Sequence, residues 1–322
     1  MDRREFLLAG AALPFGLALA PRASAARTGG GPLAFVTADL DSHIVVFDPA
    51  AARLVVRIAT LPGPRSIENV DGAKALVAHT ALGKLSLVDG PARRVRAVIE
   101  GLGAPRYTAA AGPPYAYVTD SERREVVTID IRRARIVARA RVPGPARHVT
   151  LAHDGETVWT ALGSKASELA VLAVGANGRL RPLRTITPPF PAHDVVAAPD
   201  GEHVWVTAGD SRRVAVYAVH GRRPLEVLPA GRAPQHVAFV QDRAFVASGD
   251  DGTVRIHRLN GDLVDETSVP VGSYNIAAFS VGSAVTPSLS RGTVAVLDDR
   301  SGVQAVRRIA RAAHDACLLT AY

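Results

Sequence analysis

The sequence predicts an all-β protein, a seven-bladed β-propeller of four-stranded antiparallel blades. The 322 residues include 28 glycines and 22 prolines, a composition typical of short strands joined by turns. No stretch shows sustained helical periodicity. A segment of two apolar residues followed by Thr or Ala recurs roughly 40 residues apart, which is the length of one propeller blade.

The recurring segment occupies residues 35–37, 76–78, 117–119, 158–160, 205–207, 245–247 and 284–286. Each unit divides into four strands, which in the fourth unit are expected at 148–153, 157–162, 169–174 and 183–187. Asp154-Gly155 joins the first two of these strands as a hairpin turn, because glycine tolerates the positive φ that such turns need. The fourth unit is longer than the others, and turn-rich insertions at 163–167 and 175–181 account for its extra length.

The two ends of the repeat region are complementary. The first repeat begins at Pro32 with a second-strand segment, whereas residues 314–321 resemble an inner strand with no successor. We therefore expect the C-terminal strand to join the first blade, which closes the ring and removes two exposed strand edges.

Residues 1–25 have the layout of a twin-arginine signal peptide. Arg3-Arg4 precede an apolar stretch at 6–20, and Ala23-Ser24-Ala25 supplies small residues for cleavage. The apolar stretch is shorter than the ~20 residues of a spanning helix. We expect a flexible linker at 26–32, a propeller at 33–322, export to the periplasm or the extracellular space, and no membrane span after cleavage.

Charge and cysteine content exclude several classes of protein. The formal net charge is +8 and the pI is near 10.2, but the arginines are spread along the chain and never form a run of five or six. We attribute the excess to compositional bias and expect no nucleic-acid partner. The single cysteine, Cys317, excludes a disulfide framework, a cysteine-based zinc site and an iron–sulfur cluster, and the absence of C-x-x-C-H excludes covalent haem.

Tyr117-Val118-Thr119-Asp120, followed by Val127-Thr128-Ile129-Asp130, resembles the YVTN-type β-propeller repeat family. Third strands that end in Asp at 48, 89 and 298, and Gly-Pro segments before inner strands, are similar to the same family. The resemblance implies a seven-bladed propeller. It leaves function open, because the family includes apparent binding proteins as well as lactonase-like and cofactor-bearing propellers.

The segments that enter the inner strands of a propeller converge at one mouth of its central channel. In this sequence those segments are polar, whereas the positions that follow them are mostly apolar. The resulting candidate ligand-binding residues are Arg65, Arg106, Tyr107, Arg147, His148, His193, Asp194, His236, Tyr274, Asn275, His314 and Asp315. The aspartates of the loops between second and third strands, such as Asp39, are interpreted as turn residues.

Three hypotheses account for this polar mouth. In the first hypothesis, the side chains of the mouth form hydrogen bonds with one another and with water. In the second, Arg65, Arg106 and Arg147 bind one carboxylate or phosphate ligand. In the third hypothesis a divalent metal is held by His193, His236 and His314, with Asp194 and Asp315 as ligands or orienting groups. No other cofactor is expected.

The favoured function is that of an exported, monomeric, non-enzymatic binding protein whose ligand is an anionic small molecule or a protein partner. The sequence has no G-x-S-x-G, H-E-x-x-H or P-loop motif. One alternative is a lactonase-type hydrolase in which His193–Asp194 or His314–Asp315 supplies the base and arginines stabilise an oxyanion. A divalent-metal carrier is the second alternative.

Overall fold

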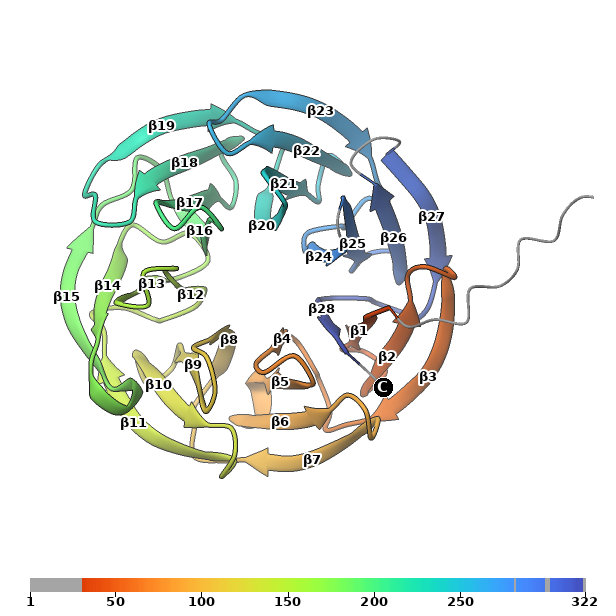
Figure 1. The fold of residues 1–322 in the computed structure, drawn as a ribbon, viewed down its shortest axis with the longest axis horizontal. Coiled ribbons are helices and arrows are strands. Elements are labelled where there is room, and N and C mark those ends of the chain that lie inside the picture. Colours follow the sequence, from red (N-terminus) through yellow and green to blue (C-terminus); the bar gives the residue numbers. More distant parts are fainter. Residues whose placement is uncertain (1–30, 281, 299–301, 321–322) are drawn as a thin grey trace, which may run out of the picture.

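The computed structural model describes residues 31–280, 282–298 and 302–320. Within these residues the chain forms seven four-stranded antiparallel sheets arranged as blades around a central channel (Figure 1). The predicted all-β, seven-bladed propeller is confirmed. The signal peptide predicted at 1–25 and most of the predicted linker lie outside the described residues. No helix in the described part of the chain has the length and apolar character needed to cross a membrane.

In each blade the four strands succeed one another from the channel outward. Blade 1 contains β28 (Ala316–Leu319), β1 (Leu33–Ala38), β2 (His43–Asp48) and β3 (Arg53–Ala59). Blade 2 contains β4 (Ile67–Asn69), β5 (Lys74–His79), β6 (Lys84–Asp89) and β7 (Arg94–Ile99), and blade 3 contains β8 (Pro105–Ala110), β9 (Tyr115–Asp120), β10 (Glu125–Asp130) and β11 (Arg135–Arg141). Blade 4 contains β12 (Val149–Leu151), β13 (Thr157–Ala161), β14 (Leu169–Val174) and β15 (Leu180–Ile186).

Blade 5 contains β16 (Ala192–Ala197), β17 (His203–Ala208), β18 (Arg213–Ala218) and β19 (Pro224–Pro229), and blade 6 contains β20 (Pro234–Val240), β21 (Arg243–Ser248), β22 (Thr253–Arg258) and β23 (Leu263–Ser268). Blade 7 contains β24 (Ala277–Ser280), β25 (Ser283–Ser288), β26 (Thr293–Asp298) and β27 (Gly302–Arg308). Two short 3₁₀ turns, η1 (Thr80–Leu82) and η2 (Ala176–Gly178), interrupt this pattern in the described residues.

The ring closes as the sequence predicts, because β28 pairs with β1. Leu33 lies opposite Leu319, and Phe35 lies opposite Cys317. The backbone N–H of His314 also donates to the carbonyl of Thr37, at 2.9 Å. The closing strand thereby brings the mouth residues that precede it into the same ring as those of the other six blades.

The fourth blade carries the predicted insertions, and one of them reaches the neighbouring blade. Ala166, in the loop between β13 and β14, forms an isolated antiparallel bridge with Ala192 of β16. The other insertion is shorter than predicted, because β15 already begins at Leu180, directly after η2. The first loop is therefore held over the entrance to blade 5.

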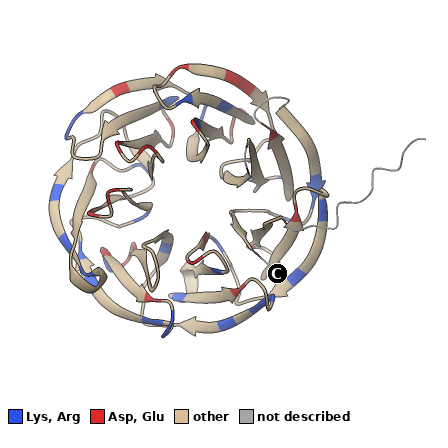
Figure 2. Cartoon of the chain, viewed as in Figure 1, with Lys and Arg blue, Asp and Glu red and all other residues tan. Residues whose placement is uncertain are grey.

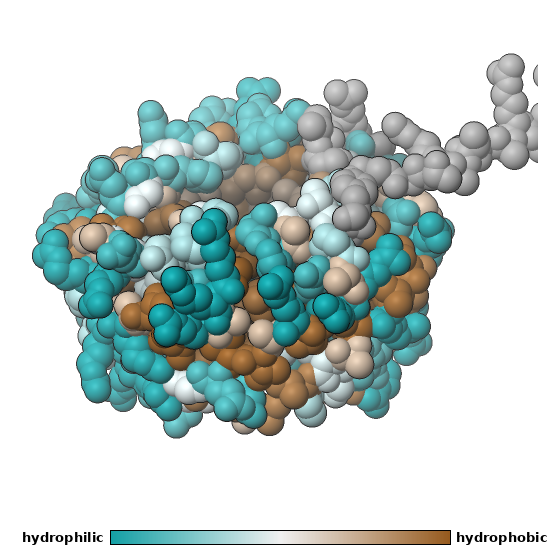
Figure 3. Space-filling view, turned by 60° about the horizontal axis from the view of Figure 1, so that its bottom comes forward, coloured by the Kyte–Doolittle hydropathy of each residue, from teal (hydrophilic) through white to brown (hydrophobic). Residues whose placement is uncertain are grey.

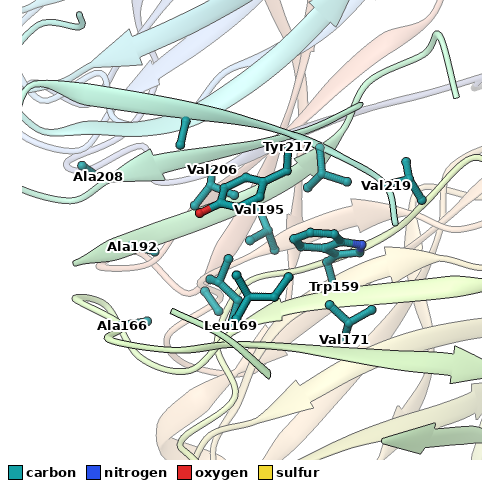
Figure 4. Packing of buried hydrophobic residues seen from close by; sticks show 14 of the residues in the cluster. Trp159, Ala166, Leu169, Val171, Ala192, Val195, Val206, Ala208, Tyr217 and Val219 are labelled. Atoms are coloured by element: carbon teal, nitrogen blue, oxygen red, sulfur yellow. The ribbon is translucent and has the colours of Figure 1, made fainter. Parts of the chain in front are cut away.

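Apolar side chains of adjacent blades interlock between the sheets. In the interface of blades 4 and 5, Trp159 and Tyr217 are fully buried and their ring centroids lie 5.8 Å apart (Figure 4). Val171, Val195 and similar side chains fill the space around them. Each such side chain contributes about 1.5–3 kcal/mol by leaving water, so the blades hold each other in place and the channel keeps its shape.

Arginines recur along the outer strands of five blades, whereas the outer strands β19 and β23 carry only acidic charges (Figure 2). Figure 3 shows hydrophilic side chains along the side of the ring, with apolar residues between them. Charged side chains on an edge strand oppose pairing with a second molecule. The charged side chains of the outer strands therefore help to keep these edges from pairing.

Candidate functional site

Threonine hydroxyls of the recurring segment hold the channel-mouth residues in place. Thr37 Oγ1 accepts a hydrogen bond from the backbone N–H of Asp315 in its own blade, at 3.1 Å. The same hydroxyl donates to the carbonyl of Arg65, which enters the next blade, at 2.8 Å. We call this two-sided contact the threonine bridge. It recurs at Thr119 with Tyr107 and Arg147, and at Thr207 with Asp194 and Gln235.

A cavity of about 340 Å³ lies at the channel mouth. Its wall contains these predicted residues: Arg65, Tyr107, Arg147, His193, His236, Tyr274, Asn275 and His314. A deeper cavity of about 430 Å³ follows the inner strands along the channel and contains His148, Asp194 and Asp315. Tyr107, His236 and Asn275 border both cavities, so they lie at the boundary between them.

Arg106 differs from the other predicted residues, because it lies beside the mouth cavity rather than in its wall. It lines a neighbouring depression together with Arg147 and Ser121, and its Nε donates to Ser121 Oγ at 3.0 Å. Burial lowers the pKa of Arg106, and the nearby charges of Arg147 and Arg65 lower it further. Arg106 is therefore close enough to Arg147 and Arg65 to feel their charges.

The mouth cavity is cationic. Arg65, Arg147 and Lys165 line it, and no Asp or Glu is among its described wall residues. Lys165 forms an ion pair with Asp210 at 3.0 Å, whereas none of the three predicted arginines has a carboxylate partner within the described chain. Arg147 also stacks over Tyr107, with its Cζ 6.0 Å from the ring centroid. These guanidinium charges are left available to a ligand.

The predicted base pairs His193–Asp194 and His314–Asp315 do not form. His193 and His314 line the mouth cavity, whereas Asp194 and Asp315 line the deeper cavity, so the imidazole and the carboxylate within each dipeptide face different spaces. His193 Nδ1 instead donates to the carbonyl of Ser164, at 3.0 Å. Asp315 accepts hydrogen bonds from two backbone N–H groups.

Histidine–carboxylate pairs form between blades instead. His236 Nδ1 donates to Asp194 Oδ2 at 3.0 Å, joining blades 6 and 5. His314 Nδ1 donates to Asp39 Oδ2 at 3.1 Å. Asp39 therefore binds a histidine of the mouth, in addition to occupying the turn that the sequence predicted for it.

The histidines that converge differ from the predicted metal-binding trio in one member. Ligand atoms of His148, His193 and His236 all lie within 4.8 Å of one another, whereas His314 is turned toward Asp39. The centroid of the His148 ring is 4.5 Å from that of His193 and 5.0 Å from that of His236. Burial, together with the nearby imidazole of His236, lowers the pKa of His193 to about 3. Burial and the other two histidines likewise hold the pKa of His148 well below its ordinary value.

Carboxyl groups gather on the deeper side of this histidine cluster. Glu68, which the sequence did not single out, lines the deeper cavity with Asp194 and Asp315. Burial, together with the nearby charges of Asp315 and Asp194, raises the pKa of Glu68 from 4.5 to about 8. Burial also raises the pKa of Asp315. Glu68 is therefore protonated at neutral pH.

Sequence reasoning missed Ser164, Lys165 and Glu68 as site residues. Ser164 and Lys165 belong to the insertion at 163–167, and the extra length of the fourth repeat was the signal that could have pointed to them. Glu68 is the charged residue that follows an apolar position in the inner strand of blade 2, so the alternation of that strand was its signal.

Comparison with known proteins supports the fold. No protein-family model and no curated protein sequence matches the chain. Among solved structures, a functionally unknown protein from Desulfotomaculum acetoxidans is similar with a TM-score of 0.79 and 12% identity, covering 90% of this chain and 99% of its own.

Two further solved structures are similar. Hydrazine synthase from Kuenenia stuttgartiensis has a TM-score of 0.67 and 16% identity, covering 80% of this chain and 90% of that one. A protein from Bacteroides uniformis described as a candidate 6-phosphogluconolactonase has a TM-score of 0.64 and 16% identity, covering 74% and 82%. At these identities the comparisons show the propeller fold alone.

The raised pKa of Glu68 predicts a dependence of stability on pH. The unfolded carboxyl ionises near 4.5, whereas the folded one keeps its proton up to about 8. The folded state therefore binds more protons in this range, and stability falls as pH rises from about 5 to about 8. The substitution Glu68→Gln should remove this part of the pH dependence and raise the melting temperature at pH 8 relative to wild type.

Thermal unfolding at several pH values checks this prediction. Glu122→Gln is the matched control, because Glu122 is exposed at the surface. A difference between wild type and Glu68→Gln that stays constant across the pH range contradicts the prediction.

Proposed function

We propose that the protein is a non-enzymatic binding protein whose channel mouth takes a small anion bearing carboxylate or phosphate groups. The observation that carries this proposal is the arginine group: Arg65 and Arg147 line the mouth cavity and have no carboxylate partner in the described chain. A guanidinium presents two parallel N–H donors, which match the oxygen pair of a carboxylate or phosphate.

The size and charge of the cavity favour a small ligand over a macromolecule. A volume of about 340 Å³ is within the range of small-molecule sites. Because burial keeps His193 largely uncharged at neutral pH, the positive charge in the cavity wall comes from Arg65, Arg147 and Lys165. A protein partner would have to insert an acidic side chain or its terminal carboxylate into this cavity. We expect the protein to act as a monomer.

Neutralising the arginines should weaken anion binding. In calorimetric titrations with small mono- and dicarboxylates and with inorganic phosphate, Arg65→Gln and Arg147→Gln should each lower the affinity for the bound anion about 10- to 100-fold. The reason is that each substitution removes one charge-assisted hydrogen bond.

Arg53→Gln is the control, because Arg53 lies on the outer strand β3 with its side chain 66% exposed. Its affinity should equal that of wild type. The proposal fails if no anion of the panel binds, or if Arg53→Gln is as damaging as the two mouth substitutions. Binding of an acidic peptide without binding of any small anion would point to the protein partner instead.

A lactonase-type hydrolase is the second candidate. The favouring observation is the His236–Asp194 pair, in which the carboxylate orients an imidazole that lines the arginine-bearing cavity. His236 would act as the base toward a water molecule, and Arg147 would stabilise the oxyanion formed by attack on the lactone carbonyl. The similar structure from Bacteroides uniformis, described as a candidate 6-phosphogluconolactonase, is consistent with this chemistry.

A lactone-hydrolysis assay separates the two candidates. If the protein is a hydrolase, wild type turns over lactones above the uncatalysed rate, and His236→Gln lowers kcat/KM about 100- to 10,000-fold. His203→Gln serves as the control and should retain activity, because His203 also pairs with an aspartate, Asp200, but lies in the wall of neither cavity. Absence of turnover by wild type rejects the hydrolase and leaves the binding protein.

We also propose that the chain is exported by the twin-arginine route. The support is in the sequence: Arg3-Arg4, Phe6-Leu7 and the Ala23-Ser24-Ala25 triplet. Residues 1–32 fused to a reporter that folds in the bacterial cytoplasm should direct it to the periplasm, as cell fractionation would show. The double substitution Arg3→Lys/Arg4→Lys should abolish this export, and Arg22→Lys should not. Equal export of the double variant contradicts the proposed route.

A further inference from the structure

The histidine cluster at the boundary of the two cavities has the properties of a ligand set. His148, His193 and His236 come from three consecutive blades, and their ligand atoms all lie within 4.8 Å of one another. They are buried, with 1%, 4% and 8% of their surface exposed. Neither ring nitrogen of His148, nor Nε2 of His193, has a hydrogen-bond partner in the described chain.

We propose that these three histidines bind one divalent transition-metal ion of the zinc class. Buried polar nitrogens without partners are costly, and an ion held by the cluster would satisfy one ring nitrogen of His148 together with Nε2 of His193. Three imidazoles are a ligand set that zinc uses in proteins, with the fourth position left to water or a ligand. The site rests on the histidines alone, so it is independent of the anion proposal.

Two of the rings are already oriented for coordination. His193 Nδ1 donates to the carbonyl of Ser164, which leaves Nε2 as the lone-pair donor. His236 Nδ1 donates to Asp194 Oδ2 and likewise leaves Nε2 for a metal. A carboxylate or carbonyl that fixes the far nitrogen is the usual support of a metal-binding histidine. The insertion loop of blade 4 thus contributes Ser164 to the support of the site.

The charges around the cluster also bear on the binding of a cation. The carboxylate of Asp194 lies against His236, while the arginines lie on the mouth side. The arginines would repel a bare cation, and they would attract an anion that accompanied the metal.

The cluster needs a modest contraction to bind zinc. Zn–N bonds of about 2.0–2.1 Å in tetrahedral geometry place ligand nitrogens about 3.3 Å apart. The present separations of up to 4.8 Å therefore close by roughly 1 Å or more. Small rotations of the side chains about χ1 and χ2 supply such a movement without displacing the strands that carry them.

Titration of the full chain, purified without a histidine tag and stripped with a chelator, tests this site. Calorimetry with Zn²⁺ should show one ion per chain, and Co²⁺ should give the visible absorption of a four-coordinate nitrogen site. His148→Gln, His193→Gln and His236→Gln should each weaken Zn²⁺ binding about 100-fold or more. Asp194→Asn, which acts through His236, should weaken it about 10- to 100-fold while one ion still binds.

His314→Gln is the matched control, because this histidine is also at the mouth and is also paired with a carboxylate. Its Zn²⁺ affinity should stay within about threefold of wild type. Far-ultraviolet circular dichroism and thermal unfolding without metal check that each variant is folded, and the His193→Gln/His236→Gln double variant repeats the test if one single variant is not. The proposal is overturned if wild type binds Zn²⁺ no tighter than this double variant, or if His314→Gln is as damaging as His193→Gln.

Discussion

The threonine bridge is the contact on which the rest of the site depends. One hydroxyl accepts from the backbone of its own blade and donates to the backbone that enters the next, so it fixes two mouth segments relative to each other. Buried backbone groups must find partners, and in this channel a side chain satisfies them across the gap between two sheets. The threonine of the recurring segment therefore fixes the backbone positions from which the arginines and histidines of the mouth project.

As a result, cationic, neutral and acidic side chains occupy different depths of the channel. Guanidinium groups and Lys165 lie at the mouth, neutral imidazoles follow, and carboxyl groups lie deeper, beside largely apolar inner strands. The order separates positive from negative groups along a short path, with Tyr107 and His236 at the boundary. Burial raises the pKa of Tyr107 to about 12, so the phenol there is uncharged. The guanidinium groups and Lys165 therefore lie nearest the opening of the mouth, and the nitrogen lone pairs of the imidazoles lie behind them.

The sequence predicted the fold because the same strand pattern recurs at a regular spacing along the chain. It predicted which residues meet at the channel mouth because the propeller topology brings the segments that enter the inner strands to one end of the channel. It did not predict the pairing of individual groups. His193 and Asp194 are adjacent in the sequence, yet they lie where the register of β16 shifts, and they bond to different partners, Ser164 and His236. His148 and His314 both come from entry segments, but His314 pairs with Asp39, whereas His148 lies in the histidine cluster.

The closing strand has a consequence for the timing of assembly. β28 is synthesised after every other strand of the ring, and it brings His314 and Asp315 to the mouth. On a translating ribosome the earlier blades can form while the last wall of the cavity is still missing. The mouth cavity is thus complete only once the two distant ends of the propeller have met.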